Sequence, residues 1–384
     1  MAAVDRVKSW GFRLAPLALA LVAVRLITPW WCGLDAHRWY SGDTAQQMRL
    51  AREVIAFEAG DDARPGPASN RFAGEWALVT HQMTALGLAQ LCLAHPELRE
   101  QLAPEITRAA LKSFRPEMRA FGTRAWSGED AMASLASGHG HAYLAYPALA
   151  LGVARMLDPA FPAAAAREHD ALIAAYERRL LASPTGLIET YPGEAYPTDT
   201  AAVAGAIAVH GRATGADHSR VLARWASLVE KVQIDPASGL LVQRMGAFDG
   251  RRHDAPRGSG TGLGAYFAGF ADRRIAGLLA RGLFRHEADF CGFGAIREYA
   301  PGHPGQGDVD SGPVLLGVSV SATGFALAVA RASGRPDSFE RLYRTTDLFG
   351  APWSSADRMR FLSGGPVGNA LLLAMLTSGP EVAP

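Results

Sequence analysis

The chain has 384 residues, of which 49% are hydrophobic, and its 38 basic and 37 acidic side chains leave a net charge of +1. This composition excludes a disordered chain, because it supplies enough apolar surface for a sizeable core. The charge balance, with no run of Lys or Arg interleaved with aromatic residues, excludes a nucleic-acid partner. Cys32, Cys92 and Cys291 are far apart and form no CxxC motif, so the cysteines predict neither a metal site nor a disulfide framework.

The first 38 residues are typical of an export signal or an uncleaved membrane anchor. Three basic residues between positions 6 and 13 precede an apolar run from Leu14 to Val24, and Trp30 and Trp31 follow. The run is short for a full span, which favours a signal peptide, yet no clear cleavage site follows, which favours an anchor. We therefore expect the protein at the cell membrane through this segment, with the rest on the extracytoplasmic side, or exported to the periplasm.

Residues 39–384 are predicted to form a single all-α domain. Apolar residues recur with helical spacing in segments separated by short connections marked by Gly and Pro. The predicted helices cover residues 44–59, 73–94, 104–114, 142–157, 163–181, 200–214, 218–232, 262–270, 273–285, 321–332 and 367–376. The predicted extended segments are residues 187–190, 240–245 and 295–299.

The helices are expected to pair into a barrel or toroid of helical hairpins. Many helices of ordinary length follow one another without βαβ alternation and without a fixed repeat period. Loops rich in Gly, Pro, aromatic and acidic residues recur between them, and at one end of a toroid such loops would line a shared cavity. Segment 311–330 carries no charge and could span a bilayer by length, but its Gly, Pro and Ser content favours an inner helix of the toroid.

The segment from residue 186 to 199 is predicted to be an active-site loop. It places Glu189 and Asp199 on irregular backbone set by two prolines and a glycine. Tyr191 and Tyr196 give it an aromatic content that a purely solvated connection does not need. We predict Glu189 and Asp199 as catalytic carboxyl groups and the two tyrosines as walls of a substrate site, with a solvated surface connection as the alternative.

A second cluster contains His139, His141 and Tyr143, at the start of the helix predicted at residues 142–157. Two histidines in this spacing predict a metal only where further ligands converge, so we predict no metal site here. His141 is instead expected to be an acid/base or hydrogen-bonding group, because the pKa of histidine lies close to neutral pH. A core histidine that hydrogen-bonds to backbone is the alternative reading.

Further candidates are spread along the chain. Asp308 and Asp310 lie where a loop rich in Gly and Pro meets an apolar helix, so either could be catalytic, while helix capping is the alternative for Asp310. Trp76 and Tyr266 are candidate walls of the substrate site, and each could equally be a core aromatic residue.

Paired carboxyl groups and a histidine in an aromatic site support two kinds of chemistry. One is hydrolysis of a glycosidic bond, which needs two carboxyl groups. The other is dehydration or isomerisation of an alcohol, which needs an acid for the hydroxyl, a base for the lost proton and aromatic shielding of a cation. The chain contains no GxGxxG, P-loop or GxSxG motif, so dinucleotide, phosphoryl-transfer and serine-hydrolase chemistry are disfavoured.

Segments 140–146, 186–192, 217–225 and 234–241 resemble the catalytic domain of the linalool dehydratase/isomerase family, over about residues 70–374. The resemblance implies an (α/α)6 barrel, activity without a cofactor and a ring of subunits, and hence a homo-oligomer. It places the family's active-site histidine at His141. The family's two catalytic cysteines fall near Glu189 and Thr198, where this chain has a carboxylate and a hydroxyl.

Together these observations predict a cofactor-independent acid/base enzyme of the lyase or isomerase type that acts on an alcohol or isoprenoid-like small molecule. A carbohydrate-active, glycoside hydrolase-like enzyme on the same scaffold is the first alternative, with Glu189 paired to Asp308 or Asp310. A non-catalytic protein that binds glycan or lipid in the cell envelope is the second.

Overall fold

The computed structural model describes Pro16, Val22, residues 24–60 and residues 73–379, apart from Phe121, Arg124, His139, Pro304 and Val309. The predicted signal or anchor covers residues 1–38, and its part up to Ala23 lies outside the described residues except for Pro16 and Val22. His139 also lies outside the described residues. The division of the chain into this segment and one domain of residues 39–384 stays a prediction.

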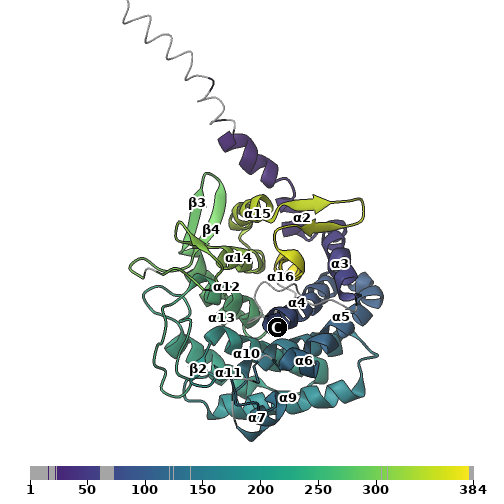
Figure 1. The fold of residues 1–384 in the computed structure, drawn as a ribbon, viewed down its shortest axis with the longest axis vertical. Helices are drawn as coiled ribbons and strands as arrows, with labels where there is room; N and C mark the ends of the chain where they lie inside the picture. The colour runs from purple at the N-terminus through teal and green to yellow at the C-terminus, as the bar shows by residue number, and fades with distance from the viewer. Residues whose placement is uncertain are drawn as a thin grey trace, which may run out of the picture.

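A closed ring of six helices forms the centre of the described part of the protein (Figure 1). In order around the ring they are α4 (Ala73–Ala94), α8 (Ala145–Leu157), α10 (Pro197–Thr214), α12 (Gly258–Ala268), α14 (Val320–Ala332) and α16 (Gly365–Thr377). Each packs against the next, and α16 packs back against α4. The predicted all-α toroid is therefore confirmed, with (α/α)6 architecture.

A second layer of helices alternates with the first along the chain and packs on its outside. It contains α3 (Thr44–Glu58), α5 (Arg99–Ser113), α9 (Ala163–Ala182), α11 (Ser219–Leu228), α13 (Arg273–Phe284) and α15 (Pro336–Gly350). The inner helix α8 is buried along nearly its whole length, whereas α11 and α13 bury only one face. This difference follows from sequence, because a helix that is apolar all round must be enclosed and an amphipathic one must face solvent.

The remaining elements are short and connect the barrel helices. Short helices are α2 (Ala36–Ser41), α6 (Pro116–Arg119) and α7 (Ala131–Ser137). The strands form an antiparallel hairpin of β1 (Glu189–Tyr191) and β2 (Glu194–Ala195), a sheet in the order β3 (Glu287–Phe290), β4 (Phe293–Arg297), β6 (Val318–Ser319) and β5 (Val314–Leu315), and a hairpin of β7 (Pro352–Ser354) and β8 (Met359–Phe361). The extended segment predicted at residues 240–245 forms only isolated bridges, including one between Leu241 and Ile234.

Two helix predictions differ from the structure. The helix predicted at residues 104–114 begins earlier, at Arg99, and Pro104 lies inside it. Proline has no backbone N–H to donate, but Pro104 is on the exposed side of α5, so the carbonyl group that lacks this donor can bond to solvent. The helix α15 was absent from the predicted set, although it buries an apolar face that contains Phe339, Leu342 and Tyr343.

Among the described residues, one helix is long and apolar enough to cross a membrane, residues Gly74–Ala94 of α4. The protein buries 83% of its apolar window, as expected of a core helix in the inner ring. The uncharged segment 311–330 contributes the inner helix α14, whose apolar residues are largely buried between its neighbours.

Close approach of the inner helices depends on glycine. A Cβ atom added at Gly87 of α4 would lie 2.7 Å from Cγ of Leu373 and 3.0 Å from the backbone nitrogen of Ala374, both in α16. At Gly324 of α14, by contrast, an added Cβ would have no neighbouring atom within 4 Å. The two glycines are therefore a matched pair for testing the closure of the ring.

We predict that Gly87→Ala lowers the free energy of unfolding by about 1–3 kcal/mol, because the new methyl group must push α4 away from α16. Gly324→Ala should raise it by about 0.5–1 kcal/mol, because alanine loses less conformational freedom in a helix. Urea unfolding of both variants beside the wild type measures this. A Gly87→Ala protein as stable as Gly324→Ala would contradict the packing described here.

Candidate active site

The two ends of the barrel differ in the length of their connections. Each inner helix is joined to the following outer helix by a short connection, such as residues 158–162 and 269–272. The connections that lead from an outer helix into the next inner helix are long, such as residues 183–196, 234–257 and 285–319. The N-terminal ends of the inner helices and all the long connections therefore lie at one end of the barrel, the loop end. Loops on a rigid scaffold are where functional groups usually sit.

Three carboxyl groups from different parts of the chain are linked by charge effects at the loop end: Glu75, Asp199 and Asp310, called here the carboxylate cluster. Glu75 lies in the first turn of α4, Asp199 in the first turn of α10, and Asp310 in the connection before β5. The charges of Asp310 and Asp199 both act on Glu75, and the charge of Asp199 acts on Asp310. Charge effects of this kind fall off with distance, so they place the three groups in one neighbourhood.

Glu75 has the most strongly altered carboxyl group of the cluster. Burial, with the charges of Asp310 and Asp199 as smaller causes, raises its pKa from 4.5 to about 8. Among the described residues, no hydrogen bond or ion pair to the Glu75 side chain is found that would stabilise its charged form. Glu75 is therefore protonated at neutral pH, in contrast to an ordinary glutamate.

Asp199 is partly buried and held by two hydroxyl groups. The Tyr146 hydroxyl of α8 donates to one carboxylate oxygen at 2.6 Å, and the Thr190 hydroxyl of β1 donates to the other at 2.5 Å. Burial raises the pKa of Asp199, and the two hydrogen bonds counteract part of this rise. Pro197 occupies the first turn of α10, so its missing N–H costs nothing and its fixed φ starts the helix that presents Asp199.

Asp310 is exposed to solvent, yet burial is the largest cause of the rise of its pKa to about 6, followed by the charge of Asp308. Among the described residues, its carboxylate makes no hydrogen bond, whereas its backbone N–H donates to Asp308 at 3.1 Å. The carboxylate is therefore free to meet a ligand.

A second layer of charged groups holds the connection that carries Asp310. One oxygen of Asp308 accepts the backbone N–H groups of Asp310 and Ser311, and the other is paired with the buried Arg257 guanidinium. Arg257 also bonds to Asp254 at 2.5 Å. Asp308, predicted as a catalytic residue, is thus engaged on both oxygens in shaping the loop. This leaves Asp310 as the carboxylate of the pair that is available for chemistry.

The active-site loop predicted at residues 186–199 divides its side chains between two places. Burial raises the pKa of the Tyr191 phenol, followed by the charges of Glu75 and Asp199, so this ring lies beside the cluster. Glu189 instead accepts a hydrogen bond from the Gly193 N–H at 3.2 Å, and its charge acts on Arg179. The register of the β1–β2 hairpin shifts between Glu189 and Tyr191, which turns the two side chains to different surroundings.

The remaining residues of this loop are held by partners of their own. The Tyr196 hydroxyl donates to Glu194 at 3.0 Å, and Glu194 is paired with Arg244 at 2.6 Å. Thr198 donates to the carbonyl oxygen of Gly260 at 2.8 Å and so ties α10 to α12. Tyr196 remains partly exposed near Asp199, whose charge contributes to raising the pKa of its phenol.

His141 lies behind the loop rather than on its open side, with an exposed fraction of 0%. Its ring is 4.7 Å from that of Trp126, and Nδ1 lies 3.3 Å from the Tyr143 hydroxyl. Tyr143 is itself buried and donates to the carbonyl oxygen of Arg119 at 3.0 Å. The pair is thus placed among core aromatic rings, with His141 at a positive φ of 68° that starts the turn into α8.

Tyr266 is buried in α12, where it packs edge-on against Phe270 at 5.5 Å between ring centroids. Trp76 is partly exposed and follows Glu75 directly in the first turn of α4. Of the predicted site residues, the structure therefore brings Asp199, Asp310 and Tyr191 into one neighbourhood, and Glu75 and Tyr146, which were not among the predicted residues, lie there as well. The neighbouring Trp76 was the only available signal for Glu75, because a single glutamate before an apolar helix is also an ordinary helix start.

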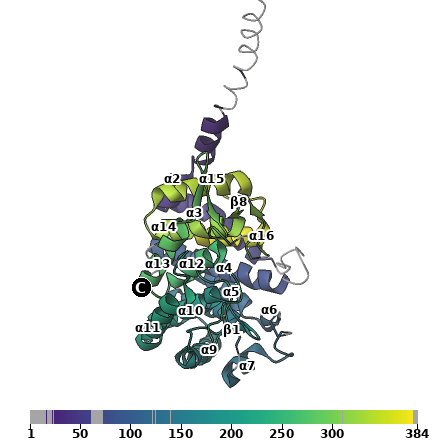
Figure 2. The same ribbon diagram turned by 90° about the vertical axis from the view of Figure 1, so that its left-hand side faces the viewer.

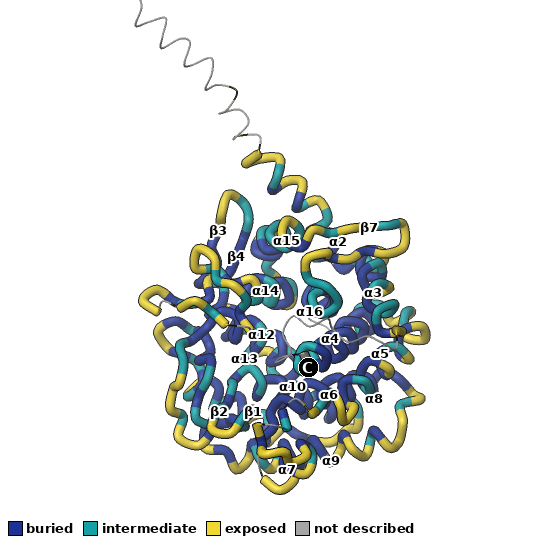
Figure 3. The backbone as a smooth tube through the Cα atoms, viewed as in Figure 1, coloured by how far each residue is buried: buried dark blue, intermediate teal, exposed yellow. Residues whose placement is uncertain are grey.

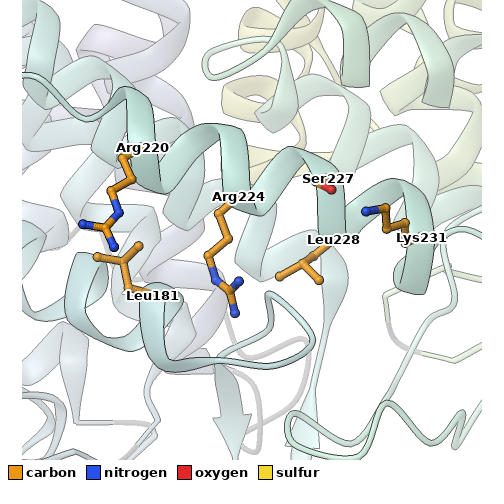
Figure 4. Close-up of a pocket in the computed structure, with 6 residues that line it drawn as sticks. All are labelled: Leu181, Arg220, Arg224, Ser227, Leu228 and Lys231. Carbon is orange, nitrogen blue, oxygen red and sulfur yellow. The ribbon is translucent and has the colours of Figure 1, made fainter.

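Two grooves on the outside of the barrel lie away from the carboxylate cluster. One, of about 560 Å³, is lined by Leu181, Arg220, Arg224, Ser227, Leu228 and Lys231, and Figure 4 shows Arg220 and Arg224 pointing from α11 to the same side. The other, of about 280 Å³, includes Arg52, Gln101 and Asp357. Neither is lined by a carboxyl group of the cluster. Within the described residues, no three His, Cys, Asp or Glu side chains are arranged to hold a metal ion.

Comparison with known proteins finds similarity only at the level of structure. No family model matches the chain, and no curated protein sequence matches it. An inactive α-1,6-mannanase variant from Salegentibacter sp. HEL1_6, with two aspartates replaced by asparagine and α-1,6-mannotriose bound, matches with a TM-score of 0.50 and 12% identity, over 88% of this chain and 99% of that chain. A family 76 glycoside hydrolase from a bovine Bacteroides thetaiotaomicron strain matches with a TM-score of 0.51 and 10% identity, over 86% of this chain and 76% of that chain.

These matches correct the resemblance to the linalool dehydratase/isomerase family, which was wrong. The similar structures are glycoside hydrolases. The predicted lyase or isomerase activity on an alcohol or isoprenoid was therefore also wrong. The physical reason is that the matched segments are mostly helix ends and turns. Any barrel of helical hairpins needs Gly, Pro and aromatic residues at such positions, so they report the architecture rather than the reaction.

We predict that Glu75→Gln stabilises the protein more at high pH than at low pH. The folded state holds the Glu75 proton to about pH 8, whereas the unfolded chain releases it near the ordinary value of 4.5. The wild type therefore loses stability as pH rises between these values, and the uncharged glutamine does not. The difference in Tm, variant minus wild type, should be larger at about pH 9 than at about pH 5, by about 1 °C for each kcal/mol recovered. An equal difference at both pH values would mean that Glu75 is not held in its neutral form.

Proposed function

We propose that the protein is a carbohydrate-active enzyme that hydrolyses glycosidic bonds at the carboxylate cluster. The observation that carries this proposal is the pair of carboxyl groups whose pKa values differ, Glu75 at about 8 and Asp310 at about 6. Cleavage of a glycosidic bond requires one carboxyl group that is protonated and another that is ionised. Two carboxyl groups whose surroundings give them different pKa values meet this requirement near neutral pH.

Glu75 supplies the proton to the oxygen of the leaving sugar. It is neutral at pH 7 because burial and the charges of Asp310 and Asp199 disfavour its ionised form. Its place in the first turn of the inner helix α4 fixes its backbone, so the proton is delivered from a rigid element.

Asp310 supplies the second carboxylate, as the base that activates water or as the nucleophile. It is ionised above about pH 6, exposed to solvent, and without a hydrogen bond from another described residue. Asp199 has both oxygens occupied by Tyr146 and Thr190. Its role is electrostatic, because its negative charge raises the pKa of Glu75 and of Asp310.

The proposed substrate is an oligosaccharide or polysaccharide. Trp76, Tyr191 and Tyr196 are partly exposed aromatic residues near the cluster, and such rings offer an apolar face to a sugar and a polar edge to its hydroxyls. The similar structure from Salegentibacter holds α-1,6-mannotriose, which supports a glycan as the class of ligand on this scaffold.

We predict that Glu75→Gln and Asp310→Asn each lower glycosidase activity by about 10²–10⁴-fold, because each removes one partner of acid/base catalysis. Purified protein incubated with a panel of polysaccharides that includes α-mannan, with release of reducing ends as readout, tests this. Asp337→Asn is the matched control, since Asp337 is an exposed carboxylate in the first turn of the outer helix α15. Activity of Glu75→Gln equal to that of the control would remove Glu75 from the reaction.

We also predict a bell-shaped dependence of kcat/KM on pH. Activity should fall below about pH 6, as Asp310 becomes protonated, and above about pH 8, as Glu75 loses its proton. Asp199→Asn removes the negative charge that raises the pKa of Glu75 and of Asp310, so both pKa values should fall and both limbs should move to lower pH. Limbs that stay in place in this variant would show that Asp199 does not set the two pKa values.

A further inference from the structure

Large apolar side chains are exposed along the N-terminal segment and on the part of the barrel from which it emerges. The N-terminal helical segment, residues 24–32, extends away from the barrel on this side, and Figure 3 shows it as mostly exposed. Trp30 and Trp31 of this segment are 60% and 65% exposed. Contiguous apolar surface of this kind is rare on a soluble monomer and indicates an interaction site.

The end of the N-terminal helical segment that is nearest the barrel packs against α15. A Cβ added at Gly33 would lie 2.9 Å from the guanidinium of Arg344 in α15, and one added at Gly292 would lie 3.4 Å from Pro29. The Cys32 thiol is hydrogen-bonded to the carboxyl group of Asp347, also in α15. In the following α2, the indole N–H of Trp39 donates to the Tyr343 hydroxyl at 3.1 Å. The direction in which the segment leaves the body is therefore set by its packing on α15.

The apolar surface continues from this segment onto the folded body. Leu348 and Phe349, which follow Asp347 at the end of α15, are 45% and 69% exposed. Trp353 of β7 and Leu362 after β8 are 47% and 54% exposed. The Leu362 N–H donates to the carbonyl oxygen of Ala351 at 3.3 Å, which holds the β7–β8 hairpin beside the end of α15. Figures 1 and 2 both show α2, α15 and this hairpin at the end of the molecule where the N-terminal segment emerges.

The sequence of the emerging segment identifies what covers this surface. From Leu14 to Leu34 the chain contains a single charged residue, Arg25. About 20 such residues are enough to cross the hydrocarbon core of a bilayer. Trp30 and Trp31 stand at its body-proximal end, where the water interface of a membrane favours tryptophan. The exposed side chains of the body begin beside the end of this segment, so a bilayer that holds the segment would also reach them.

We propose that this membrane face, made of Trp30, Trp31, Leu348, Phe349, Trp353 and Leu362, inserts into the interfacial layer of a lipid bilayer. The barrel is then seated on the membrane by its own wall and not only tethered through the N-terminal segment. Burial of these side chains among the headgroups removes apolar surface from water, and Arg360, 5.1 Å from the centroid of the Trp353 ring, stands beside the lipid phosphates. The proposal is independent of the reaction at the carboxylate cluster.

A fluorescent label at position 349 of the full chain tests the proposal. The label is an NBD group on Phe349→Cys in a Cys291→Ser background, since Cys291 is exposed while Cys32 and Cys92 are buried. The protein is added to vesicles of phosphatidylcholine and phosphatidylglycerol. The emission of the label should shift to shorter wavelength and lose most of its intensity when part of the lipid carries a doxyl quencher. Leu181→Cys, on the outer helix α9 and 37% exposed, is the matched control and should show neither change.

Two outcomes would overturn the proposal. Emission from position 349 that is the same with and without vesicles would show that the body does not touch lipid. A shift that lipid-borne quencher leaves unchanged would mean that protein, such as a second copy of this chain, covers the face. Trp353→Cys, labelled in the same way, repeats the test if Phe349→Cys does not fold.

Discussion

Closure of the inner ring is the constraint on which the rest of the structure depends. Six helices can close only if each approaches two neighbours at once, and the small residues at their contacts make this possible. In addition to Gly87 against Leu373, a Cβ at Gly152 of α8 would lie 2.9 Å from Val209 of α10, and one at Gly205 of α10 would lie 3.1 Å from the Phe267 carbonyl of α12. Bulkier residues at these sites would open the ring, because packed interiors have no spare volume.

The carboxylate cluster is a consequence of that closure. Glu75, Asp199 and Asp310 are far apart along the chain and meet because α4, α10 and the connection before α14 share the loop end. Three carboxyl groups in one place oppose folding, since the charges of Asp199 and Asp310 disfavour the ionised form of Glu75, and the charge of Asp199 disfavours that of Asp310. Helix N-termini offset part of this cost for Glu75 and Asp199. A protein keeps such a cluster against its own stability where the cluster serves a reaction.

The sequence predicted the barrel better than the site because the two depend on different information. Helical periodicity is local, so α4 was predicted with the observed bounds and most inner helices to within a few residues. The partners of a carboxyl group are set by closure over long stretches of chain. Nothing local distinguishes Asp310, which faces solvent and the cluster, from Asp308, which is bound to Arg257. Likewise, the register shift in β1 that separates Glu189 from Tyr191 is a property of the folded hairpin.

The two proposals place their surfaces on different parts of the barrel, and this arrangement makes them compatible. The membrane face is built on the outer helix α15 and the β7–β8 hairpin, to which the N-terminal segment is bound. The carboxylate cluster lies at the loop end, among the first turns of the inner helices. The β7–β8 hairpin belongs to the connection from α15 into the inner helix α16, so the membrane face borders the loop end. Glu75, Asp199 and Asp310 come from α4, α10 and the connection before α14, so no element of the membrane face supplies a carboxyl group to the cluster, and the two proposals can be tested separately.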